Sequence, residues 1–286
     1  MIYALSDTHL SFSSNKPMSI FGEIWAHHTE KIAHNCAAVL QPTDILLLPG
    51  DLSWALKLAE ARKDLTFLDA LPGRKILLRG NHDYWWSTRT KMQRYCREWG
   101  LKTLYFLDRN AFLLRRNKAV SAYDILLAGR NETAENGGRQ ADTQAIWQQE
   151  PILQEQPEFI GIIGTKGYLL PFEQQNEHDR ILAAREYERL LYSLQQLEAL
   201  LLLNGIKKSE VKLLCLTHYP PLLKGRGSSI YSSLYEKLQA EYQTVQAVYG
   251  HLHGLGIKEA FEGRYNSVDY YLVSADARTF APQALL

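Results

Sequence analysis

Cysteine, long apolar runs and an excess of one charge are all missing or scarce in this chain. Only Cys36, Cys96 and Cys215 occur among 286 residues, and an odd, scattered set is typical of reduced thiols rather than of a disulfide framework. The longest apolar runs, such as 200–203, are far shorter than the ~20 residues that span a bilayer. The amino terminus has no signal-peptide pattern. We therefore expect a cytoplasmic protein with no membrane partner.

The charge balance gives no strong preference for a polyanionic partner. The chain has 32 Lys and Arg against 31 Asp and Glu, so its net charge is +1. Residues 74–118 are locally basic, with twelve Lys and Arg against three acids. Helical spacing of these bases favours a solvated helix face, and a cationic surface for an anionic substrate is the alternative. Nucleic acid is thus a disfavoured partner class.

Several motifs of enzyme active sites are also absent. The sequence contains no P-loop, no Gly-x-Gly-x-x-Gly after a strand and no His-Glu-x-x-His. It likewise has no Gly-x-Ser-x-Gly elbow and no Cys-x-x-Cys pair. Nothing in the chain therefore points to a serine or cysteine nucleophile, or to a nucleotide held by a glycine-rich loop.

What the sequence does contain is a series of five short polar clusters, almost all directly after a short β-favouring apolar run. In α/β proteins, ligand-binding loops leave the carboxyl ends of strands. The clusters are Asp7-Thr8-His9, Gly50-Asp51, Gly80-Asn81-His82-Asp83, Thr217-His218 and Gly250-His251-Leu252-His253.

The side chains in these clusters are nitrogen and oxygen donors suited to metal ions. Asp7 and His9 lie two residues apart, so they face the same side if strand geometry persists. The same spacing relates His251 and His253. Asp51 adds a carboxylate that can bridge two cations through its two oxygens. The joint pattern predicts a two-metal site.

Each cluster alone has an ordinary explanation. A single Asp-x-His is often a turn capped by its own aspartate, and a single His218 after an apolar strand is often a hydrogen-bonded interior histidine. The joint pattern changes this interpretation, because five of the nine histidines fall inside the clusters. Asn81 completes the donor set with a neutral amide oxygen.

The order D-x-H, G-D, G-N-H-D, H, G-H-x-H resembles the calcineurin-like metallophosphoesterase superfamily from Asp7 to His253. The stretches at 50–54 and 79–86 resemble a bacterial subgroup of predicted phosphohydrolases. The resemblance implies hydrolysis of a phosphomonoester or phosphodiester by attack of metal-bound hydroxide. It also implies a small phosphorylated substrate and no protein nucleophile.

The resemblance also implies a ligand set for each metal. One metal would be held by Asp7, His9, Asp51 and His253. The second would be held by Asp51 again, with Asn81, His218 and His251. An imidazole, carboxylate and amide set suits several transition metals, and we expect manganese or iron, with zinc as an alternative.

His82 and Asp83 are the predicted catalytic residues. By resemblance, His82 stays off the metals and protonates the leaving group or stabilises transition-state charge. Asp83 either orients His82 or serves as a structural residue ahead of Trp85, and the sequence leaves both interpretations open.

Two further residues are predicted substrate contacts. Arg130 begins a polar, glycine-containing stretch that reads as a loop over 130–140. Lys166 lies in a second glycine-containing stretch, 161–168, whose glycines would let the backbone approach a phosphate. Both residues are equally compatible with plain surface charges.

Hydrophobic spacing predicts helices over 23–40, 54–70, 86–99 and 179–203, with strands before the polar clusters. Alternating strands and helices predict an α/β layered protein. The resemblance adds an αββα sandwich of two sheets flanked by helices. We expect one domain over 1–286 with an elaboration at 108–180, and the oligomeric state is left open.

Two other functions remain as alternatives. A nuclease of the same superfamily would need a continuous basic groove, which the near-zero net charge disfavours. A protein-binding scaffold without catalysis would be expected to lose His82 or a ligand, whereas this chain keeps all eight positions.

Overall fold

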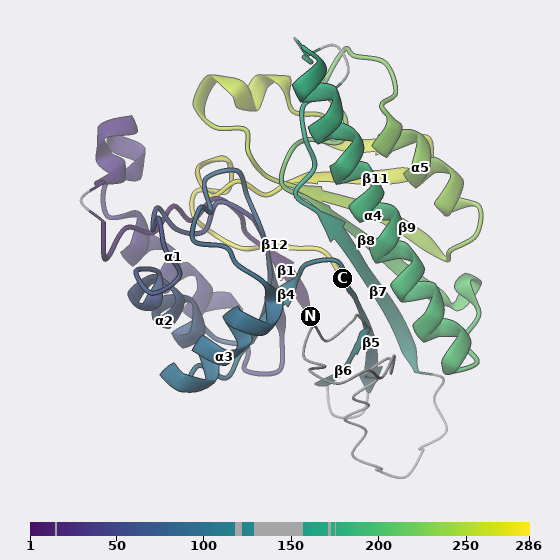
Figure 1. Cartoon of the computed structure of the whole chain (residues 1–286), viewed down its shortest axis with the longest axis horizontal. Coiled ribbons are helices and arrows are strands. Elements are labelled where there is room, and N and C mark those ends of the chain that lie inside the picture. Colours follow the sequence, from purple (N-terminus) through teal and green to yellow (C-terminus); the bar gives the residue numbers. More distant parts are fainter. Residues whose placement is uncertain (15, 118–121, 129–156, 171–172, 175) are drawn as a thin grey trace.

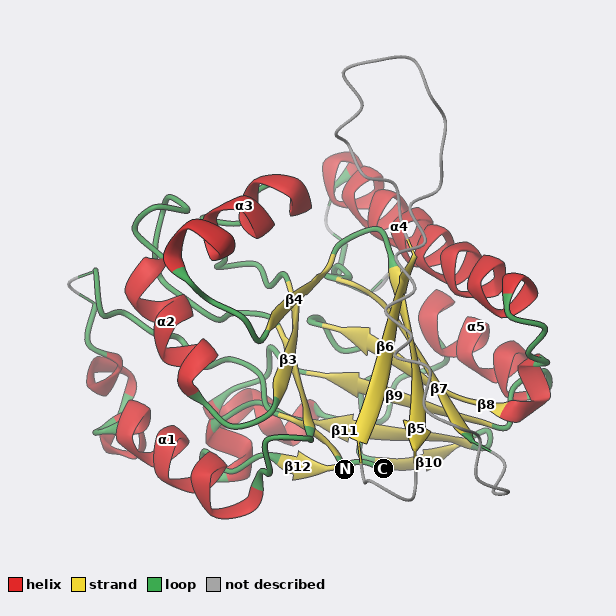
Figure 2. Ribbon diagram, turned by 90° about the horizontal axis from the view of Figure 1, so that it is seen from below, coloured by secondary structure: helices red, strands yellow, loops and turns green. Residues whose placement is uncertain are grey.

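The computed structural model describes residues 1–14, 16–117, 122–128, 157–170, 173–174 and 176–286. Two β-sheets face each other, and helices cover the outer face of each (Figures 1 and 2). Both chain ends meet in the first sheet, where the Ile2 amide donates to the Leu286 carbonyl at 2.7 Å. The predicted α/β sandwich of two sheets flanked by helices is confirmed.

The first sheet has the strand order β12-β1-β2-β3-β4. Strands β1 to β4 are parallel to one another, and the edge strand β12 is antiparallel to β1. The strands are β1 (Ile2–Ala4), β2 (Ile45–Pro49), β3 (Arg74–Leu78), β4 (Leu104–Leu107) and β12 (Gln283–Ala284). The helices that cover it are α1 (His28–Val39), α2 (Arg62–Ala70) and α3 (Arg89–Trp99).

The second sheet has the order β10-β11-β9-β8-β7-β5-β6. Its strands are β5 (Ala111–Asn117), β6 (Ala122–Ala128), β7 (Glu158–Thr165), β8 (Val211–Thr217), β9 (Thr244–Tyr249), β10 (Gly263–Tyr265) and β11 (Val268–Leu272). Helices α4 (Glu177–Leu203) and α5 (Ile230–Gln239) cover it. Short 3-10 turns are η1 (Met18–Phe21), η2 (Glu23–Trp25), η3 (Lys208–Glu210), η4 (Gly254–Glu259) and η5 (Asp276–Arg278).

Alternating residues of the central strands fill separate cores, because successive side chains point to opposite faces of a sheet. In β2, Ile45 and Leu47 join the core between the two sheets, whereas Leu46 and Leu48 join the core under α1 to α3. A strand covered on both faces has no need of polar residues, which explains why it reads as a continuous apolar run.

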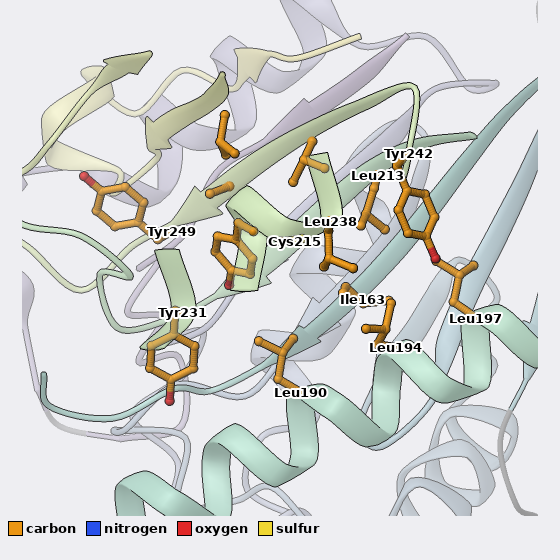
Figure 3. Close-up of a cluster of buried hydrophobic side chains, with 14 of the residues drawn as sticks. Ile163, Leu190, Leu194, Leu197, Leu213, Cys215, Tyr231, Leu238, Tyr242 and Tyr249 are labelled. Atoms are coloured by element: carbon orange, nitrogen blue, oxygen red, sulfur yellow. The ribbon is translucent and has the colours of Figure 1, made fainter. Parts of the chain in front are cut away.

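The apolar stripe predicted for the long helix packs on the second sheet. Leu190, Leu194 and Leu197 of α4 point toward Ile163 and Leu213 of the strands in Figure 3, within one buried cluster. The apolar stripe of α4 is therefore buried against the second sheet and is not an exposed surface. Among the described residues, no helix has the length and apolarity needed to cross a membrane.

Two predicted helices begin later than expected. The helix predicted from residue 23 begins at His28, because His27 adopts a left-handed conformation after the 3-10 turn η2. The helix predicted from residue 54 begins at Arg62, because side chains compete for the preceding amides. Ser53 Oγ accepts from the Ala55 amide, and Glu60 Oε2 accepts from the Leu56 amide, at 3.1 Å each.

The other two predicted helices agree closely with the structure. Helix α3 begins at Arg89, slightly after the predicted residue 86, where the Thr88 side chain caps the Lys91 amide, and it ends at Trp99, followed by Gly100 with a φ of 75°. Gly100 thus takes the left-handed conformation that glycine adopts most readily after a helix. Helix α4 is capped by Asn176, whose side chain accepts from the Asp179 amide at 3.0 Å.

Candidate metal centre

The five polar clusters converge where the carboxyl ends of β1, β2, β3, β8 and β9 meet. Backbone hydrogen bonds tie the loops together. The Asp7 amide donates to the Gly50 carbonyl at 2.9 Å, and the Gly250 amide donates to the His218 carbonyl at 3.1 Å. Parallel strands within each sheet bring their carboxyl ends to one edge, and facing of the sheets brings the two edges together.

The backbone at the centre departs from strand geometry. Strand β1 ends at Ala4, and Asp7, His9, Asp51 and His251 have positive φ values of 59°, 43°, 53° and 73°. Strand geometry therefore does not persist to Asp7 and His9, and the left-handed turns bring their side chains into one donor group instead. Left-handed residues other than glycine are uncommon and cost conformational energy, and they concentrate at functional sites.

The first donor group consists of Asp7, His9 and His253, each offering an atom within 4.8 Å of the others. His253 Nε2 lies 3.1 Å from Asp7 Oδ1. Asp7 is fully buried, and His9 is nearly so. An unpaired buried carboxylate is costly, so this arrangement requires cationic partners.

The second donor group consists of Asp51, His218 and His251. Asn81 joins them, with its Oδ1 2.7 Å from His218 Nε2 and 2.9 Å from His251 Nδ1. The two imidazole nitrogens are themselves only 3.3 Å apart. Nitrogen and oxygen donors thus point at one small space.

Asp51 connects the two groups. Its Oδ2 lies 3.9 Å from His9 Nε2 in the first group and 3.4 Å from His218 Nε2 in the second. The structure therefore brings together all seven residues that the sequence analysis selected as ligands. Their imidazole, carboxylate and amide donors fit two transition-metal cations, and this fit rests on donor convergence alone.

The charges of the first group depend on one another. Burial alone would raise the pKa of Asp7, but His253 and His218 hold it well below its usual range. Burial would lower the pKa of His253, but Asp7 and a hydrogen bond to Asp276 raise it to about 10. Binding of a cation by His253 Nε2 would therefore require the loss of a proton from this ring.

Two other histidines are held in the neutral form. Burial lowers the pKa of His9 to about 4. Burial, followed by the nearby His218, lowers the pKa of His251 to about 3. A neutral imidazole is the form that binds metal ions, so these two side chains are ready to bind a cation at neutral pH.

Asp276 is a part of the centre that the sequence analysis missed. His253 Nδ1 donates to Asp276 Oδ1 at 2.8 Å, and the Gly254 amide donates to Asp276 Oδ2 at 3.0 Å. This contact turns His253 Nε2 toward Asp7 and fixes which nitrogen carries the proton. Asp276 lies in η5, beyond the last polar cluster and in no recognisable motif, so no sequence signal marked it.

Two glycines are required by close approach of the chain. A Cβ atom on Gly80 would lie 2.1 Å from the Asp51 amide nitrogen, and one on Gly250 would lie 2.2 Å from Ser6 Oγ. Any side chain at these positions would displace the aspartates beside them. Steric crowding therefore explains why the G-N-H-D and G-H-x-H clusters begin with glycine.

The predicted catalytic histidine lies at the edge of the centre. The His82 ring is 4.6 Å from the Trp54 ring and 5.9 Å from the His9 ring, and its backbone amide donates to Asp51 Oδ1 at 2.8 Å. Burial lowers its pKa from the ordinary value, although the side chain is only partly buried. The ring thus stays near the predicted metal ligands without joining either donor group.

Asp83 has a different environment from the one expected of a partner to His82. It is fully buried, and its carboxylate accepts from the amides of Leu52, Ser53 and Gly80 at 2.9, 3.1 and 2.7 Å. The Trp85 indole also donates to it at 2.9 Å. These contacts join the loop that carries Asp51 to the loop that carries Asn81.

Of the two predicted substrate contacts, the structure describes only Lys166. Lys166 follows β7, and its carbonyl accepts the amides of His218 and Tyr219 at 3.0 Å each. Arg130, and the loop predicted at 130–140, lie outside the described residues.

The glycines before Lys166 have a packing role. A Cβ atom on Gly161 would lie 2.6 Å from Leu197 Cδ2, and one on Gly164 would lie 2.7 Å from the Leu216 carbonyl. Both belong to β7, so the prediction that they let the backbone approach a phosphate is wrong. They let α4 and the neighbouring strand come close instead.

Comparison with known proteins assigns the chain to a protein family. The family model for calcineurin-like phosphoesterases matches residues 1–255. The comparison with curated proteins gave no match.

Among solved structures, three similar ones come from different bacteria. The protein of unknown function AQ665 from Aquifex aeolicus is 15% identical, with 99% of this chain and 94% of that chain covered and a TM-score of 0.38. The phosphopantetheinyl hydrolase PptH from Mycobacterium tuberculosis is 15% identical, with 100% and 95% covered and a TM-score of 0.46. The calcineurin-like phosphoesterase YfkN from Bacillus subtilis is 15% identical, with 95% and 80% covered and a TM-score of 0.43.

Proposed function

Because the chain belongs to the calcineurin-like phosphoesterase family, we propose that it is a two-metal hydrolase of a small phosphomonoester or phosphodiester. The observation that carries this proposal is the pair of donor groups that share Asp51. When bound, two cations in such a site supply a nucleophile from water at neutral pH and neutralise charge that develops on the phosphoryl oxygens.

The side chains divide the remaining work. Asp7, His9, Asp51 and His253 would hold one cation, and Asp51, Asn81, His218 and His251 would hold the other. His82 protonates the leaving oxygen or stabilises its developing charge, because its ring lies beside His9, its backbone amide contacts Asp51, and the side chain remains partly accessible to a substrate. Lys166 binds an anionic part of the substrate. We assign Asp83 to positioning, since its oxygens accept the amides that set the two loops.

The proposal also covers the identity of the metals and the cellular location of the protein. Imidazole nitrogens and carboxylate oxygens together support manganese or iron, with zinc as the alternative. Three reduced, buried cysteines support a cytoplasmic location.

The first test is hydrolysis of mono- and bis-nitrophenyl phosphate by chelator-treated protein refilled with manganese. Turnover should require the metal, and His82→Ala should lower it about 10²- to 10⁴-fold, the usual contribution of a general acid. His34→Ala is the matched control, because this exposed histidine lies on α1, away from both donor groups. Metal-loaded protein without turnover on either ester, or an unaffected His82→Ala variant, would contradict the respective assignment.

A further inference from the structure

Two cationic side chains, Arg79 and Lys166, leave the two facing sheets at neighbouring points. In the first sheet, Leu78 of β3 pairs with Leu107 of β4. Across the sandwich, a Cβ atom on Gly164 of β7 would lie 2.8 Å from Leu107 Cδ2. Arg79 directly follows Leu78, and Lys166 lies two residues beyond Gly164. Both residues therefore emerge at the same edge of the sandwich as the metal ligands.

Lys166 contacts the second donor group through its backbone. Its carbonyl accepts the amide of the ligand His218, and its Nζ lies 5.9 Å from the Tyr219 ring centroid. The Tyr219 ring in turn lies 4.2 Å from the ring of the ligand His251. A second aromatic ring, that of Tyr168, lies 5.3 Å from the same ammonium. The ammonium thus lies on the side of the centre formed by His218 and His251.

Arg79 is close in sequence to a residue of the same donor group. It directly precedes Gly80 and the ligand Asn81. Its Nε is buried and has no hydrogen-bond partner among the described residues. A buried donor without an acceptor costs free energy, and a bound anion would supply that acceptor.

The acid with the largest charge effect on Lys166 is Glu186, and it does not neutralise the ammonium. The carboxylate of Glu186 is already engaged, since Thr165 Oγ1 donates to its Oε2 at 2.6 Å and Arg189 donates to its Oε1 at 2.6 Å. The side chains of Lys166 and Arg79 are both partly buried. In the described part of the chain, neither Lys166 nor Arg79 forms an ion pair. Partly buried like charges of this kind favour a bound anion.

We propose that Arg79 and Lys166 form a second anion subsite, beside His218 and His251, that binds a second anionic group of the substrate. The preferred substrates are therefore phosphate esters that carry another phosphate or a carboxylate. This inference rests on the proposed phosphoesterase function. A phosphoryl group at the metals and another anion between the two cations would neutralise both sites at once.

Two matched substrate pairs test the subsite and separate its two ligand types. Fructose 1,6-bisphosphate against fructose 6-phosphate differs by one phosphate, and 3-phosphoglycerate against glycerol 3-phosphate differs by one carboxylate. Phosphate release by the manganese-loaded protein gives KM for each. We expect the member with the extra anion to have a KM at least about tenfold lower, because charge-assisted hydrogen bonds are the strong ones. The pair that shows the larger ratio identifies the ligand type.

Substitutions then locate the effect. In Lys166→Met and Arg79→Met the KM ratio within the favoured pair should fall toward one, whereas Lys166→Arg should restore most of it. Lys237→Met is the control, since this exposed lysine lies on α5, and it should keep the wild-type ratio. Lys166→Arg and Arg79→Lys keep the charge and the approximate volume, so they test the subsite even if a methionine variant folds poorly.

A binding measurement separates failure of the subsite from failure of the proposed function. Calorimetric titration of metal-loaded wild-type protein and of its His82→Ala variant with both fructose phosphates needs no turnover. Tighter binding of the bisphosphate, lost in Lys166→Met, supports the subsite even in a protein that hydrolyses no nitrophenyl ester. Equal affinities and equal KM values in both pairs, from protein that does hydrolyse nitrophenyl phosphate, would overturn the subsite alone.

Discussion

Single residues at the metal centre are held by contacts that leave little freedom. Gly250 shows this most directly, because a Cβ there would lie 2.3 Å from Asp7 Oδ2. His253 is fixed from both sides, by Asp7 through Nε2 and by Asp276 through Nδ1. Preorganisation of this kind keeps ligand atoms in place before a cation arrives, which lowers the cost of binding.

The first prediction at this scale concerns Asp276. Asp276→Ala removes the acceptor for His253 Nδ1, so the ring should rotate and the first cation should bind about 10- to 100-fold more weakly. Competition against a chromogenic chelator, with metal content measured by mass spectrometry, reads this affinity directly. Asp269→Ala on β11 is the control. Unchanged affinity in Asp276→Ala would show that His253 needs no such support.

The second residue-scale prediction concerns Gly250. Gly250→Ala places a methyl group 2.2 Å from Ser6 Oγ, so Asp7 must move and metal content should fall below two per chain. Gly227→Ala is a matched control, because nothing lies within 4 Å of a Cβ there. Overpacking of a close contact typically costs about 1–3 kcal/mol, and urea unfolding should show this difference between the two variants. Equal metal content and equal stability would refute the steric argument.

At the scale of elements, strands are joined by charges as well as by backbone ladders. Glu158 of β7 forms ion pairs with Lys212 of β8 and with Arg116 of β5, the latter at 3.3 Å. Burial alone would raise the pKa of Glu158, but the hydrogen bond and charge of Lys212, followed by those of Arg116, lower it below 4.5. The carboxylate therefore ties three neighbouring strands at the end of the sheet opposite the metal centre.

This arrangement predicts a pH dependence. The folded-state pKa of Glu158 is depressed, so its stabilisation is fully present above pH 4.5 and is lost as pH falls through the folded-state value. Glu158→Gln should lower the free energy of unfolding by about 0.5–1 kcal/mol at neutral pH, a small value because solvent screens a partly exposed pair. Urea titrations from neutral pH to about pH 4 should show the gap to wild type closing in acid. Glu188→Gln, at an exposed position of α4, should show no such gap, and a gap that widens in acid would contradict the assignment.

At the scale of the whole molecule, the candidate metal centre joins the two sheets. One donor group draws Asp7 and His9 from the first sheet and His253 from the second, and Asp51 approaches His218 across the same boundary. Bound cations would therefore hold together layers that otherwise meet through the apolar core between the sheets.

Removal of metal should therefore lower thermal stability. A cation present at about 100 times its Kd adds about 2.7 kcal/mol to the free energy of unfolding, which corresponds to roughly 5 °C in Tm for a chain of this size. Differential scanning calorimetry with and without a chelator measures the shift. Asp51→Asn should reduce the shift, because Asp51 contacts both donor groups. Identical Tm values for chelated and metal-loaded wild type would argue against a two-metal site.

The sequence by itself determined much of the architecture and the chemistry. The apolar runs before Asp7, Asp51, Asn81 and His218 became strands, because a strand covered on both faces must be apolar throughout. The polar clusters marked the loops at their carboxyl ends, and the residue types in those clusters limited the chemistry to nitrogen and oxygen ligation. These features are local, so a local pattern suffices to predict them.

Only the tertiary structure decided the features that depend on chain segments far apart in sequence. The start of α2 is the exception at short range, because the Ser53 and Glu60 side chains satisfy nearby amides against the helical spacing. The need for glycine at position 164 comes from the close approach of Leu107 from the other sheet. No sequence pattern around Gly164 indicates this contact. Asp276 reached His253 because β11 pairs with β9, and Lys166 reached the edge where Arg79 emerges because the two sheets face each other. Contacts across such distances follow from packing, and a single sequence carries no local trace of them.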